Sequence, residues 1–117
     1  MILSASYAYS QTSVLHNVGA TITVTGGGLL FVSGNTEIHA GRINVLDIGK
    51  ATFDGSVTIH TGGLYFMNDG AGKVTGNLDI KKDGICWRHK PGVLTVEGTV
   101  LNDGELNNEG EIVIGKP

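Results

Sequence analysis

The stretch Val57-Thr58-Ile59-His60, which lies between Gly55 and Gly76, contains the pattern that decides the fold. Its apolar and polar residues alternate, and a period of two is typical of a β-strand with one face turned inward. Glycine recurs around this stretch at a constant spacing, at Gly34, Gly55 and Gly76, and Gly98 follows with one extra residue. The stretch therefore belongs to a repeat of about 21 residues.

Further columns of similar residues recur at the same spacing. They are Ile38, Ile59 and Ile80; Ile22, Ile43, Leu64 and Ile85; Val24, Val45, Phe66 and Trp87; Val32, Phe53, Val74 and, after one inserted residue, Val96; and the corner residues Gly28, Gly49, Gly70 and Pro91. Like residues recur when each turn of a coil stacks on the previous one at the strand spacing of about 4.8 Å. The sequence predicts an all-β fold, a single-stranded parallel β-solenoid of about five turns of about 21 residues.

The last copy of the repeat differs from the others. Gly98, Gly104 and Gly110 are six residues apart, as in a hexapeptide coil. The segment is also acidic, because it contains Glu97, Asp103, Glu105, Glu109 and Glu111 before Lys116. Two interpretations remain open: an acidic cap that prevents end-to-end stacking, or the start of further turns.

Composition excludes several classes of protein. The chain has 117 residues, which is the size of one small domain, and 19 of them are glycine. A single cysteine excludes an internal disulfide and zinc modules that need two or four cysteines. The net charge of −3 argues against a nucleic-acid partner, and no apolar run is long enough for a membrane span.

The first ten residues differ in composition from the rest of the chain. They contain no charge and no glycine, and they end in Ala8-Tyr9-Ser10, with small residues at the positions that signal peptidase accepts. We interpret residues 1–10 as the remnant of a secretory signal peptide and residues 11–117 as the solenoid domain. The alternative is an ordinary first strand. The signal interpretation predicts a secreted or cell-surface protein.

The glycine-rich turns, the Ile/Leu/Val alternation and the segment from Leu101 to Ile112 resemble right-handed parallel β-helix repeats. In particular, residues 11–117 resemble repeat regions of large secreted bacterial surface proteins, the class often exported by type IX secretion. That resemblance implies a stalk, spacer or adhesive surface. The chain also has a weaker similarity to bactofilins, which are β-helical proteins that polymerise through their ends. Bactofilin turns are shorter than this repeat, and bactofilins lack an export signal.

One cluster of candidate metal ligands follows from the stacking. His39 and His60 are one repeat apart, and Glu37 lies two residues before His39. All three alternate with inward residues, so we expect them to share an outer face. Two imidazoles and a carboxylate can bind zinc, copper or nickel. The alternative is a solvated polar ladder, and Lys81, the next residue of the histidine column, would repel a cation.

The segment from Lys81 to Pro91 contains half of the lysine and arginine residues. Arg88, His89 and Lys90 are candidates for contact with an anionic ligand or a glycan. The alternative is a turn whose charges are merely solvated. Trp87 lies one repeat after Phe66, in an inward column, so we expect it to belong to the core. Its neighbour Cys86 should then lie outside or at a corner.

These observations favour a non-enzymatic structural or adhesive module of an exported bacterial surface protein, with no cofactor. We find no pair of carboxylates that would support glycoside hydrolysis. One alternative is a scaffold that self-associates end to end through its solenoid ends. Another is recognition or processing of carbohydrate. Expected partners are a second copy of the chain and a cell-surface glycan or protein.

Overall fold

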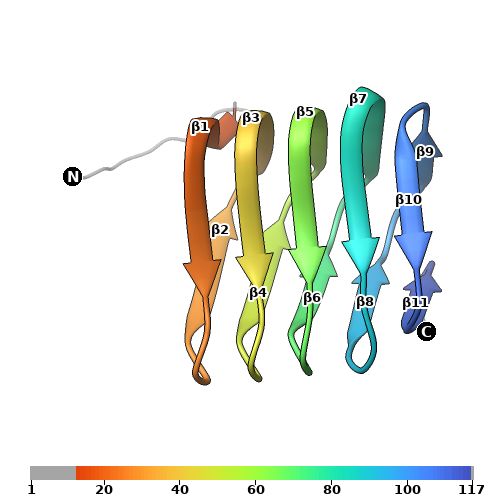
Figure 1. Ribbon diagram of the computed structural model, residues 1–117. Helices are drawn as coiled ribbons and strands as arrows, with labels where there is room; N and C mark the ends of the chain where they lie inside the picture. The colour runs from red at the N-terminus through yellow and green to blue at the C-terminus, as the bar shows by residue number, and fades with distance from the viewer. Residues whose placement is uncertain (1–12, 117) are drawn as a thin grey trace.

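The computed structural model describes residues 13–116, and it confirms the predicted parallel β-solenoid of about five turns. Every strand pair in this range is parallel. Figure 1 shows the successive turns side by side, with the long strands in one layer and the short strands behind them. The predicted signal remnant at residues 1–10 lies outside the described residues.

The strands form two sheets that face each other. The six-stranded sheet contains β1 (Ser13–Val24), β3 (Asn35–Val45), β5 (Val57–Phe66), β7 (Leu78–Arg88) and β10 (Glu105–Asn108) in spatial order, and β9 (Val100–Asn102) also pairs with β7. The five-stranded sheet contains β2 (Leu29–Ser33), β4 (Lys50–Asp54), β6 (Ala71–Val74), β8 (Val93–Val96) and β11 (Glu111–Ile114). Each of the first four turns thus contributes one long strand, bent near its middle, and one short strand (Figure 1).

The core consists of the inward residues of both sheets. Ile38 pairs with Ile59, and Ile59 pairs with Ile80, so the predicted isoleucine column is a real stack. Ile43 and Leu64 are likewise register partners, and all five side chains are fully buried. The neighbouring polar residues face outward because side chains alternate along a strand.

A side-chain ladder closes the corners that follow β2, β4, β6 and β8. The backbone N–H of Ser56 donates to Oδ1 of Asn35 at 2.9 Å, and the N–H of Asn77 donates to Oγ of Ser56 at 3.1 Å. The N–H of Thr99 then donates to Oδ1 of Asn77 at 2.9 Å. Each of these turns therefore satisfies a backbone donor of the next turn where the strand pairing is interrupted.

The inserted residue lies earlier than the sequence pattern predicts. Leu64 pairs with Cys86 rather than with Ile85, and Phe66 pairs with Arg88 rather than with Trp87. The pairing becomes irregular between Ile59 and Thr61, opposite the charged residues at positions 81–83. The predicted core position of Trp87 is therefore wrong, because a shift by one residue exchanges the two faces of a strand.

The last turn is shorter than the turns before it. Leu106 pairs with Cys86, and Ile112 pairs with Leu94, so both pairs are closer in sequence than Ile59 and Ile80 are. The glycines at six-residue spacing divide this turn into the three short strands β9, β10 and β11. Residues 13–116 contain no helix with the length and apolar character of a membrane span.

Candidate functional site

Three histidines form a ladder on the outer face of the six-stranded sheet. The rings of His39 on β3 and His60 on β5 stack with centroids 4.6 Å apart and planes 3° from parallel. The ring of His16 on β1 stacks on His39 at 5.6 Å and 1°. The alternation of His39 and His60 with the buried Ile38 and Ile59 turns both imidazoles to solvent.

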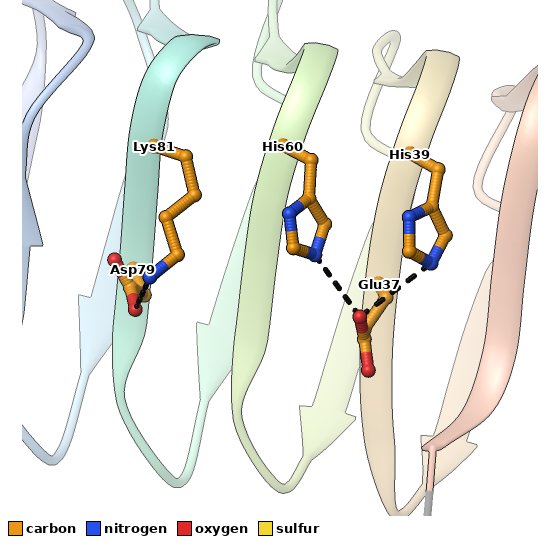
Figure 2. Close-up of polar contacts among 5 residues, drawn as sticks. All are labelled: Glu37, His39, His60, Asp79 and Lys81. Carbon is orange, nitrogen blue, oxygen red and sulfur yellow. Dashed lines mark hydrogen bonds and ion pairs between the residues drawn. The ribbon is translucent and has the colours of Figure 1, made fainter.

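Glu37 connects two members of this ladder. Its Oε1 lies 3.0 Å from Nε2 of His60 and 3.5 Å from Nε2 of His39, as Figure 2 shows. One ligand atom from each of the three residues lies within 4.8 Å of the others. The structure therefore brings together the three residues that the sequence places on one face, and metal binding by them stays a prediction.

The lysine that follows the histidine ladder is held by a carboxylate of its own strand. Nζ of Lys81 lies 3.0 Å from Oδ2 of Asp79, and both residues belong to β7 (Figure 2). Asp79 continues the column of Glu37 through Thr58. The charge of Lys81 is thus compensated locally, which weakens the repulsion that it would exert on a cation at the histidines.

The three basic candidates Arg88, His89 and Lys90 do not form one surface patch. The side chain of Arg88 is fully buried. Its Nη1 donates to the carbonyl of Phe66 at 3.3 Å, and its Nη2 donates to the carbonyl of Gly92 at 2.5 Å. Burial lowers the pKa of the guanidinium. Arg88 therefore acts inside the fold, whereas Lys90 is exposed.

Cys86 is also inside the fold, which corrects the expectation that it lies outside or at a corner. Its side chain is fully buried, and it occupies the core column of Leu64. Burial raises the pKa of the thiol to about 12, against a smaller lowering by the nearby Arg88. A protonated, covered thiol is a poor nucleophile.

Sequence reasoning missed a second outer feature, which we call the aromatic face: Arg42, Tyr65, Trp87 and His89. The guanidinium of Arg42 lies 4.3 Å from the ring centroid of Tyr65, and the rings of Trp87 and His89 stack at 4.7 Å. Tyr65 and Trp87 are register partners on β5 and β7. The spacing of three glycines could have revealed this face. Gly41 and Gly62 are one repeat apart, whereas Gly62 and Gly84 are one residue farther apart. The inserted residue therefore lies before Gly84, and it turns Trp87 to the outer face.

We compared the chain with family models, curated proteins and solved structures, and none of the three comparisons gave a match.

Proposed function

We propose that this chain is a non-enzymatic structural or adhesive module of an exported bacterial surface protein, and that the adhesive role is the one its surface favours. The observation that carries the proposal is the aromatic face on the outer side of the six-stranded sheet. Interfaces are enriched in tyrosine, tryptophan and arginine, which offer large contact areas. A sheet face that recurs from turn to turn keeps such side chains at constant spacing along the solenoid.

The local packing supports a preformed contact surface. A Cβ at Gly63 would lie 2.5 Å from Cε2 of Tyr65, so the hydroxyl end of the Tyr65 ring occupies the space beside Gly63. Arg42 covers the ring from the neighbouring strand, and cation–π contact restricts both side chains. Side chains that are already ordered lose less entropy when a partner binds. The apolar ring faces and polar neighbours suit a cell-surface glycan or protein.

The test of the adhesive role is retention of protein-coated beads on a panel of immobilised glycans and cell-surface proteins. We expect the natural chain to be retained, and Tyr65→Ala or Trp87→Ala to reduce retention. Ile48→Ala is the matched control, because Ile48 is 62% exposed in the corner between β3 and β4 and belongs to neither the aromatic face nor the end turns. Retention equal to that of uncoated beads, or equal loss in all three variants, would contradict an adhesive role for the aromatic face.

Export is tested separately by fractionating the cells that make the protein. An epitope placed near the carboxyl end should be found at the surface or in the medium. N-terminal sequencing of that material should begin at Gln11, if residues 1–10 are the remnant of a signal. Protein confined to the cytoplasmic fraction would contradict the export half of the proposal.

A second candidate function, end-to-end self-association, is favoured by one specific observation. Large apolar side chains that remain exposed gather on the first and last described turns. They are Val18, Leu29 and Phe31 on the first turn and Leu101, Val113 and Ile114 on the last, with Ile48 as the exception among residues 15–116. Strand edges with exposed apolar residues are templates for pairing with another chain.

Sedimentation velocity at increasing protein concentration tests this second function. Self-association predicts a sedimentation coefficient that rises with concentration, and Leu101→Lys with Val113→Lys should abolish the rise. Ile48→Lys serves as the control, because Ile48 is exposed on a middle turn. A constant sedimentation coefficient would rule out end-to-end association.

A further inference from the structure

We propose that Glu37, His39 and His60 form a binding site for a divalent transition-metal ion, with Zn²⁺ as the simplest occupant. The site lies across β3 and β5 and is independent of the aromatic face. Its ligands are two imidazole nitrogens and one carboxylate oxygen, with the remaining positions open to water. Three protein ligands and an open position are the usual set of an accessible zinc site.

Two of the three distances between the donor atoms fit this ion, and the third, between the two imidazole nitrogens, lies within 4.8 Å and must shorten when the ion binds. Ligands bound at about 2.0 to 2.1 Å in a tetrahedral site lie roughly 3.4 Å from one another. Oε1 of Glu37 lies 3.0 Å from Nε2 of His60 and 3.5 Å from Nε2 of His39. The carboxylate oxygen is therefore already at the separation from both nitrogens that a shared ion requires. The strand register holds this arrangement, because Glu37 pairs with Thr58, two residues before His60.

One adjustment is required before the ion can bind. The two imidazole planes are 3° from parallel and stacked, so their in-plane lone pairs do not meet at one point. At least one ring must tilt toward the ion. The side chains of His39 and His60 are 41% and 38% exposed, and exposed side chains change rotamer within nanoseconds. The tilt therefore needs no movement of the strands.

The surrounding charges permit a cation. Glu37 contributes a negative charge at the site, whereas Lys81 is paired with Asp79 at 3.0 Å on the next strand (Figure 2). The two imidazole nitrogens and one carboxylate oxygen also determine which metal ions should bind most tightly. Imidazole favours Ni²⁺, Cu²⁺ and Zn²⁺, whereas Mg²⁺ and Ca²⁺ prefer sites made of oxygen ligands alone. We therefore expect Zn²⁺ to bind and Mg²⁺ not to compete with it.

The experiment is isothermal titration calorimetry of the full chain with Zn²⁺, with an excess of Mg²⁺ present. We expect one Zn²⁺ per chain, and binding weakened by about tenfold or more in His39→Gln, His60→Gln and Glu37→Gln. His89→Gln is the matched control, because Nδ1 of His89 also lies beside a carboxylate, Oε1 of Glu109 at 3.3 Å, but this pair lacks a second imidazole. Circular dichroism verifies that each variant is folded.

A second readout identifies the ligands directly. Electron paramagnetic resonance of the chain loaded with one equivalent of Cu²⁺ should show coupling to two imidazole nitrogens, and to one in His60→Gln. The proposal is overturned if Zn²⁺ does not bind. It is also overturned if the affinity changes equally in His60→Gln and His89→Gln, or if the Cu²⁺ spectrum is the same in His60→Gln and the natural chain.

Discussion

Ile48 adopts a backbone conformation that branched residues avoid. It follows Asp47 in the corner between β3 and β4, and the two residues have φ values of 59° and 50°. The N–H of Gly49 donates to the carbonyl of Leu46 at 2.9 Å, which closes a type I′ turn. The same corner is occupied by Gly26-Gly27 one turn earlier, where positive φ carries no steric cost.

Ile48→Gly should therefore stabilise the fold. A left-handed conformation costs a residue with a Cβ about 1 to 2 kcal/mol, and the side chain of Ile48 is 62% exposed, so little burial is lost. We expect the free energy of unfolding in urea to rise by about 1 kcal/mol. Ile48→Ala, which keeps a Cβ, should give a smaller gain. A glycine variant less stable than the alanine variant would contradict this account of the turn.

Cys86 should be unreactive in the folded protein. Its pKa of about 12 keeps the thiol protonated at neutral pH, and its side chain has no exposed surface. We expect a thiol reagent at pH 8 to label the chain only after denaturant is added. Labelling of the native protein at the rate of the unfolded chain would contradict the buried position of Cys86.

The raised pKa of Cys86 also predicts how the free energy of unfolding depends on pH. The folded pKa of about 12 lies above the ordinary value of 9.0, so the unfolded state loses the proton first. The contribution of Cys86 is fully present below pH 9 and is lost as the pH rises from there toward 12. The loss of stability over this range should be larger in the natural chain than in Cys86→Val, measured by urea denaturation. Equal losses would contradict the shift.

At the scale of the elements, the bends of the long strands depend on close contact between glycines. A Cβ at Gly62, where φ is 93°, would lie 2.0 Å from the carbonyl oxygen of Gly41 on the previous strand. Gly19 has a similar φ of 111° on β1, but a Cβ there would meet no atom within 4 Å. Comparing substitutions at the two positions therefore distinguishes the strain of positive φ, which both share, from the steric clash with the neighbouring strand, which only Gly62 would suffer.

Gly62→Ala should be more destabilising than Gly19→Ala. Both variants carry the strain of positive φ, but only Gly62→Ala forces two strands apart, and overpacking adds about 1 to 3 kcal/mol. Thermal denaturation of both variants measures the difference. Equal melting temperatures would show that the turns are not in contact at this bend.

Part of the strand arrangement could be predicted from the sequence, and part could not. Strand alternation and the constant repeat length identify the stacked columns from Ile38 and Ile59 onward. The register of β7 was not recovered, because the apolar Ile85 and Trp87 fit an inward pattern better than Cys86 and Arg88 do, and arginine is rarely buried. Alternation shows only that one of the two sets faces inward, and a shift by one residue exchanges them. The recurring bend at Gly62 and Gly84 was the better marker of the register.

The candidate metal site was predictable in composition but not in geometry. The spacing places His39, His60 and Glu37 on one outer face. It does not show that a single carboxylate oxygen contacts both imidazoles, because rotamers are set by packing rather than by repeat length. His16 was missed because it is two residues farther from His39 than one repeat; it is the register partner of Glu37, and its ring reaches His39 diagonally across the two strands.

At the scale of the whole molecule, the described residues form a stack in which strands pair only with those of neighbouring turns. The number of residues per turn changes along the stack. The turn from Leu64 to its partner Cys86 is one residue longer than the usual repeat. The turn from Leu94 to its partner Ile112 is shorter than the usual repeat. Inward residues nevertheless remain above one another, because the length changes occur at bends and corners. Repeat proteins accept such changes because each unit contacts only its neighbours.

Backbone nuclear Overhauser effects in the isotopically labelled chain test the parallel solenoid most directly. Parallel stacking predicts cross-strand contacts between Ile43 and Leu64 and between Leu64 and Cys86. It predicts none of the short Hα–Hα contacts that mark antiparallel pairs. Antiparallel contacts between neighbouring strands, or pairing of Leu64 with Ile85, would contradict the parallel solenoid and its register.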